Sequence, residues 1–186
     1  GDELWGFARH GSAAAPFVPD VVVMGKPMGN GYPVAATAMR PEIAERFGRD
    51  MRYFNTFGGN PVAMAAAQAV LDVLRDEELQ ENARVVGERL RAQVRELDHP
   101  CIGDVRGAGL FIGVELVHPD GSEDGDLTLA VVNGLQQRRV LVATGGLHNN
   151  VLKVRPPLCF SDADADRFVT ELDAVKVVSS YRASVE

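Results

Sequence analysis

The stretch PDVVVMGKPMGNGYPVAA, residues 19–36, decides the fold. Its residues 20–24 include an apolar, valine-rich run, and such a run without polar alternation is typical of a strand buried on both faces, as in a parallel sheet. Residues 25–33 are dense in glycine, proline and asparagine, which mark a turn. A second apolar stretch, residues 34–39, predicts another strand. The sequence therefore predicts part of a mainly parallel α/β domain with Lys26 in the loop that follows a strand.

Lys26 occupies a position suited to chemistry. In open α/β sheets, ligands bind at the carboxyl ends of the strands, and a lysine that is partly removed from water there is a usable amine nucleophile or base. Gly29 and Gly31 would let the backbone approach a ligand closely. A phosphate-binding P-loop fits poorly, because Pro27 stands where Ser or Thr is required. The residues alone leave open an ordinary surface lysine in a turn.

The rest of the chain alternates helices and strands. Helices are predicted at residues 41–47, 62–75, 77–96, 126–138 and from Ser161 onward, and strands within residues 105–117 and at 140–143 and 151–154. Asn60 followed by Pro61 is a strong helix start, because Asn caps free amide groups and Pro fits the first turn. The pattern changes near residue 76. We therefore expect the end of a parallel-sheet domain at residues 1–75 and a small α+β domain at residues 76–186.

Composition excludes several classes of function. The 186 residues carry a formal charge of −7 with scattered basic residues, so we expect neither nucleic acid nor a membrane as partner. No apolar run approaches the roughly 18 residues of a membrane span. Cys101 and Cys159 lie far apart without CxxC spacing, which argues against a disulfide framework or zinc site and favours the cytoplasm. The dispersed histidines and the acidic residues 120–126 match no metal-binding pattern.

Four segments resemble the class III aminotransferases, which are pyridoxal-phosphate (PLP) enzymes of fold type I. Residues 19–36 resemble the family's cofactor-lysine motif, and FNTFGGNPVAMAAAQAVLDVL, residues 54–74, resembles its next signature. VRGAGLFIGVEL, residues 105–116, is similar to the entry into its small domain, and NVLKVRPPLCFS, residues 150–161, to its final active-site segment. The segments occur in the family's order and span nearly the whole chain. The resemblance implies that residues 1–75 end the PLP-binding large domain and residues 76–186 form the small domain.

The resemblance also implies roles for particular residues. Lys26 would form the internal Schiff base with PLP and then carry a proton between the substrate Cα and the cofactor C4′. Thr56 matches the threonine that binds the PLP phosphate of the other subunit, which implies a homodimer with shared active sites. The family's pyridine-binding aspartate is expected upstream of residue 1, because residues 4–7 resemble the stretch that follows it, so Asp2 is set aside. A fragment without that aspartate is expected to be inactive alone.

The substrate end departs from the family pattern. Many members carry an arginine that clamps the substrate carboxylate where this chain has Lys153, with Arg155 two residues on and on the same face of a strand. The segments GKPMGNG, residues 25–31, and LKVRPPLCF, residues 152–160, resemble the subgroup that includes alanine–glyoxylate-type aminotransferases and phospho-lyases. We expect amino transfer from an amino acid or amine to an oxo acid. The alternatives are a phospho-lyase acting on a phosphorylated amine such as ethanolamine phosphate, and a non-catalytic remnant.

Overall fold

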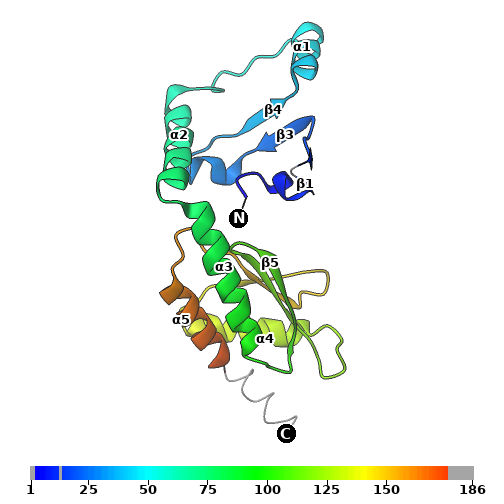
Figure 1. The fold of residues 1–186 in the computed structure, drawn as a ribbon, viewed down its shortest axis with the longest axis vertical. Coiled ribbons are helices and arrows are strands. Elements are labelled where there is room, and N and C mark those ends of the chain that lie inside the picture. The colour runs from blue at the N-terminus through cyan, green and yellow to red at the C-terminus, as the bar shows by residue number, and fades with distance from the viewer. Residues whose placement is uncertain (1–2, 13, 176–186) are drawn as a thin grey trace. The chain divides into compact units, whose positions relative to one another are not determined.

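The computed structural model describes residues 3–12 and 14–175, which form two compact units, residues 3–78 and residues 79–175 (Figure 1). Both units contain helices and strands, as expected for a mixed α/β chain. Within the described ranges, we find no helix with the length and hydrophobicity needed to cross a membrane.

The first unit combines short strands with two longer helices. Its elements are η1 (Gly6–Arg9), β1 (Gly11–Ser12), β2 (Ala15–Pro16), β3 (Val21–Met24), η2 (Lys26–Gly29), β4 (Ala36–Met39), α1 (Pro41–Asp50) and α2 (Pro61–Asp76). The helix start predicted at Asn60 is confirmed, because its side chain accepts a hydrogen bond of 2.9 Å from the Ala63 amide. Among the described residues of this unit, the buried apolar side chains are few and small, Ala63 and Ala67 of α2.

The pairing of β3 differs from the expectation of a parallel sheet. β3 and β4 are antiparallel, with Val21 opposite Met39. Val23 is 78% exposed, whereas the unbroken apolar run predicted burial on both faces. An all-apolar strand is favoured where both faces are covered, and β4 is the single strand that pairs with β3 among the described residues. Apolar side chains of β3 are therefore left uncovered within this unit.

The second unit is an antiparallel sheet packed against helices. Its elements are α3 (Leu79–Glu96), β5 (Ile102–Ala108), β6 (Phe111–Leu116), α4 (Gly125–Gln137), β7 (Ala143–Gly145), β8 (Val151–Val154) and α5 (Asp162–Asp173), and the strand order is β5-β6-β8-β7. Alternate residues of β6 and β8 are buried. That alternation gives the sheet one face in the core and one outer face.

The core of this unit is contiguous. It includes Val86, Leu90 and Val94 of α3, whose spacing places them on one face of the helix. α3 also approaches the turn between β5 and β6 very closely: a Cβ atom built on Gly87 would lie 2.1 Å from the Gly109 carbonyl oxygen. The backbone of the helix therefore lies directly against the turn, and glycine at position 87 permits that contact.

The boundaries of the later elements follow their capping residues. Asp124 accepts a 2.8 Å hydrogen bond from the Leu127 amide at the start of α4, and Ser161 forms a capping box with Asp164 at the start of α5, as the sequence indicated for Ser161. β8 has the predicted bounds. β7 begins at Ala143 rather than near residue 140, because the apolar residues before it pack against the core without joining the sheet.

Candidate cofactor and substrate sites

Lys26 begins η2 directly after β3, as the sequence predicted. Its φ of 43° lies in the left-handed region, which few residues other than glycine adopt. Such a conformation costs on the order of 1 kcal/mol or more, and strained backbone of this kind occurs in turns and clusters at active sites. The Lys26 side chain is exposed. The turn is held by backbone hydrogen bonds, including one of 3.0 Å from the Met28 amide to the Gly25 carbonyl.

Thr56 lies exposed in the loop between α1 and α2. Its neighbour Asn55 organises that loop. The Asn55 Oδ1 atom accepts hydrogen bonds from the amides of Phe57 (3.2 Å) and Gly58 (2.9 Å), and its Nδ2 donates to the Tyr53 hydroxyl at 3.1 Å. Sequence reasoning missed Asn55, although an Asn shortly before two glycines is a signal for a side-chain-stabilised turn.

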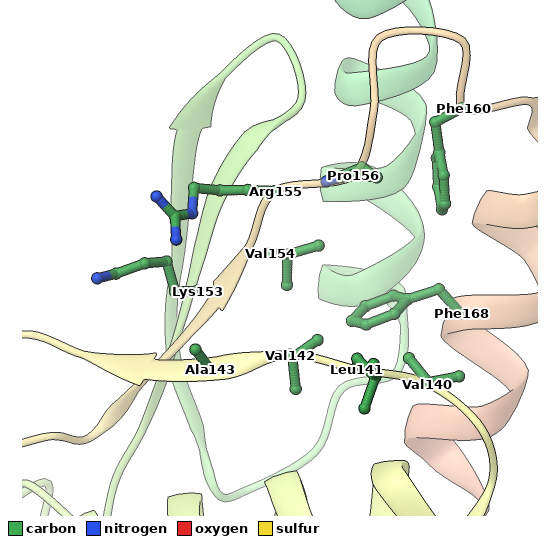
Figure 2. A pocket seen from close by; sticks show the side chains of 10 residues that line it. All are labelled: Val140, Leu141, Val142, Ala143, Lys153, Val154, Arg155, Pro156, Phe160 and Phe168. Atoms are coloured by element: carbon green, nitrogen blue, oxygen red, sulfur yellow. The ribbon is translucent and has the colours of Figure 1, made fainter. Parts of the chain in front are cut away.

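Lys153 and Arg155 line one cleft of about 280 Å³ in the second unit. Figure 2 shows both side chains extending to the same side of β8, as residues two apart in a strand should. The Arg155 guanidinium carbon lies 5.9 Å from the centre of the Phe111 ring, a cation–π contact that restrains it. The remaining lining is apolar and consists of Val140, Leu141, Val142, Ala143, Val154, Pro156, Phe160 and Phe168.

No described acidic residue neutralises the charges of this cleft. On the same sheet, Arg106 pairs with Asp104 at 2.9 Å and also with Glu115. The pKa of the Glu115 carboxyl lies below its usual value, chiefly because Arg106 donates a hydrogen bond to it. In contrast, neither Lys153 nor Arg155 takes part in an ion pair with any described residue. The cleft therefore presents two positive charges available to an anion.

The structure brings some of the predicted residues together and not others. Lys153 and Arg155 share a cleft in the second unit, whereas Lys26 and Thr56 lie on separate loops of the first. Asp2 lies outside the described residues. No group of three or more His, Cys, Asp or Glu side chains suited to a metal ion occurs in the part of the chain that the structure describes.

The cysteines are both free thiols. Cys101 is buried beside His99, with 3.1 Å between Sγ and Nδ1, and burial raises the pKa of Cys101 to about 11. A thiol with so high a pKa is unreactive at neutral pH. Cys159 is exposed.

Solved structures define the class of protein. The chain is similar to a phospholyase from Arthrobacter in complex with phosphoethanolamine (TM-score 0.84, 38% identity), covering 88% of this chain and 39% of that one. It is also similar to an amine transaminase from an uncultivated Pseudomonas species in its PLP-bound form (TM-score 0.73, 30% identity), covering 84% of this chain and 38% of that one. The fold is thus that of PLP-dependent enzymes.

Sequence comparison then gives the family. The model of the class III aminotransferases matches residues 2–175, and the chain belongs to that family, whose cofactor is PLP. It is 48% identical to the ethanolamine-phosphate phospho-lyase homolog 1 of Caenorhabditis elegans (86% of this chain) and 46% identical to the alanine–glyoxylate aminotransferase 2-like protein of Drosophila melanogaster (88% of this chain). The chain spans 35% of the length of each of these two relatives.

Proposed function

We propose that the full-length protein is a PLP-dependent aminotransferase that moves an amino group from an amino acid or amine to an oxo acid. The observation that carries this proposal is Lys26, an exposed amine held in a left-handed backbone conformation directly after β3, within the segment that matches the family. The amine of Lys26 and the hydroxyl of Thr56 fit a cofactor with an aldehyde and a phosphate. The 186-residue chain would then be one part of that enzyme, and it would be inactive alone.

Lys26 and Thr56 take different roles in this proposal. PLP, when bound, withdraws electrons from the α-carbon of the substrate. Lys26 would hold the cofactor covalently and, once released, would carry a proton between that carbon and the cofactor C4′. The hydroxyl of Thr56 donates a hydrogen bond to a phosphate oxygen. The hydrogen bonds of Asn55 hold the loop that carries Thr56 in place.

Lys153 and Arg155 bind the anionic group of the substrate. Neither charge takes part in an ion pair with a described residue, and the two side chains extend to the same side of β8 (Figure 2). A lysine is a point charge and does not impose the planar two-point geometry that arginine gives a carboxylate. The pair therefore suits a carboxylate or a phosphate.

That tolerance supports a second candidate, a phospho-lyase that releases phosphate from a phosphorylated amine such as ethanolamine phosphate. The structural relative from Arthrobacter is described with phosphoethanolamine bound, and the C. elegans relative is named for the same chemistry. A non-catalytic remnant, serving as a binding or dimerisation module, is the third candidate.

The proposed assembly is a homodimer with shared active sites. One protomer supplies Lys26, and Thr56 of the partner subunit contacts the phosphate, an arrangement that a twofold axis provides twice.

We assign residues 1–75 to the large domain and residues 76–186 to the small domain, supported by the division into compact units after Glu78. The two free thiols support a reducing compartment such as the cytoplasm.

The shared-site proposal is tested by mixing full-length subunits that carry Lys26→Ala with subunits that carry Thr56→Ala. In a mixed dimer, one site holds both lesions and the other holds neither, so part of the activity returns. Either variant alone, mixed with itself, is the control. Full activity of a stable monomer would contradict the shared site.

The reaction is tested on the purified full-length protein loaded with PLP. One assay measures amino transfer from L-alanine to glyoxylate, and a second measures phosphate release from phosphoethanolamine. Amino transfer without phosphate release supports the aminotransferase, and the reverse result supports the phospho-lyase. Failure to bind PLP would show a remnant. The Lys26→Arg variant is the matched control, because it keeps the positive charge and removes the amine chemistry.

A further inference from the structure

Lys153, on the outer face of the sheet, lies opposite a small residue on each neighbouring strand. In the register of the sheet, Gly113 of β6 lies opposite Lys153 on one side and Ala143 of β7 lies opposite it on the other. Two residues beyond Ala143, the edge strand β7 ends at Gly145, which is buried. The long charged side chain of Lys153 therefore has small residues opposite it on both neighbouring strands.

The contact with Gly145 is the closest of these. A Cβ atom built on Gly145 would lie 2.7 Å from the Lys153 Cε atom and 3.3 Å from its Nζ atom. These atoms are the end of the lysine side chain, so the space beside Gly145 is occupied by the part of Lys153 that carries the charge. The backbone of Gly145 does not require glycine, because its φ is not among the positive values of the described glycines.

We propose that Gly145 is a positioning residue: the absence of a side chain there sets where the Lys153 ammonium lies, and thereby how tightly the cleft binds the anionic group of the substrate. This inference rests on the proposed role of Lys153 in substrate binding. Gly145 acts through Lys153 and touches neither substrate nor cofactor in this account.

The geometry explains why a single methyl group would matter. Arg155 is restrained by the Phe111 ring, so it does not follow when Lys153 is displaced. The distance between the two charges then changes, and an anion that fitted between them contacts one of them poorly. The displaced atoms belong to a flexible side chain, so the fold should tolerate Gly145→Ala.

Gly113 offers a matched control on the same face. It lies opposite Lys153 in the register, yet a Cβ atom on Gly113 would meet Val151 Cγ1 at 3.1 Å and Arg106 Cγ at 3.9 Å, with no Lys153 atom within 4 Å. Gly113→Ala therefore adds the same methyl group next to the same lysine without displacing its charge.

The test is a double-mutant cycle in the full-length holoenzyme, with Gly145→Ala, Lys153→Ala, both together, and Gly113→Ala. The KM and kcat are measured for L-alanine with glyoxylate and for phosphoethanolamine, and the Kd of phosphoethanolamine is measured by calorimetry. We expect Gly145→Ala to raise the KM or Kd about five- to tenfold, as expected for a weakened charged hydrogen bond, with kcat nearly unchanged. Gly113→Ala should leave these constants unchanged.

In the Lys153→Ala background, Gly145→Ala should change the KM or Kd by less than about twofold, because its effect needs the lysine. An equal effect in both backgrounds would overturn the inference, as would wild-type binding by Gly145→Ala when Lys153→Ala binds weakly. If Lys153→Ala binds as tightly as the wild type, the proposed substrate role of Lys153 fails first, and the inference fails with it. Thermal unfolding of each variant separates these outcomes from loss of the fold.

Discussion

The two units of the chain differ in how far they cover their own apolar residues. Residues 79–175 enclose a contiguous core in which Leu90, Val114 and Leu152 are fully buried. Residues 3–78 leave Val23 and Phe54 78% and 85% exposed. Apolar area contributes roughly 25 cal/mol per Å² when it is removed from water. The pattern of β8 thus reflects contacts made inside its unit, whereas the pattern of β3 indicates surfaces that the described residues do not supply.

The largest effect is expected in the unit with the incomplete core, because it carries the proposed cofactor lysine. Lys26→Ala in the full-length enzyme should abolish turnover, since neither the covalent attachment nor the proton carrier remains. The measurement is the rate of amino transfer and of phosphate release. Borohydride reduction of the wild type, followed by peptide mapping, should place the phosphopyridoxyl label on Lys26, and a label on another lysine would contradict the assignment.

Two alanine substitutions in the 186-residue chain, one in each unit, test the comparison of the two cores. Leu90→Ala should lower the free energy of unfolding by about 2–5 kcal/mol, because it opens a cavity in a closed core. Val23→Ala should change it by less than about 0.5 kcal/mol, because the side chain is exposed. Urea unfolding followed by circular dichroism and hydrogen exchange checks both. In the full-length protein, Val23→Ala should become costly, and a negligible cost there would contradict the view that β3 is covered.

A smaller effect is expected from the loop of Thr56. Asn55→Ala removes the side chain that holds the loop through three hydrogen bonds, and we expect the apparent Kd for PLP to rise about tenfold. Titration of the full-length apoenzyme with PLP gives this value. Asn55→Asp keeps the acceptor oxygen and should be milder. Gln68→Ala, which removes an exposed amide from α2, is the matched control. An equal rise in the Kd for PLP in that variant would contradict a specific role of Asn55 in holding the loop.

The smallest effect concerns pH and the second unit. The pKa of the Glu115 carboxyl is lower in the folded protein than its ordinary value of 4.5, so its ion pair with Arg106 stabilises the fold at neutral pH. That contribution is lost as the pH falls below about 4.5 and through the lower folded-state value. Glu115→Gln should cost under about 1 kcal/mol at pH 7, and less at pH 3. Urea unfolding at both values tests this, with Glu77→Gln as the control.

Much of the second unit could be predicted from the sequence, because its signals are local. The capping serine at position 161 and the strand at residues 151–154 each follow from short patterns that their own neighbours satisfy. The antiparallel pairing of β3 and the late start of β7 could not be predicted. An apolar run states that a segment is covered, but not by which strand or in which direction.

The candidate site shows the same limit. Lys26, Thr56, Lys153 and Arg155 were identifiable by residue type and resemblance, and their roles remain predictions. The left-handed conformation of Lys26, the hydrogen bonds of Asn55 and the clearance beside Gly145 depend on backbone angles and on side chains distant in sequence. Periodicity and composition carry no record of such distances.

The alternation of β8 links the cleft to the folding of the chain. Leu152 and Val154 face the core, and Lys153 between them faces outward. A slip of one residue in the register of β8 would turn the lysine into the core and the leucine out of it. Burying an unpaired ammonium is strongly unfavourable, so a chain that folds stably has already oriented Lys153 correctly. Stable folding therefore requires the outward orientation of Lys153. A chain with a slipped register in β8 is a misfolded protein rather than a folded protein with a defective cleft.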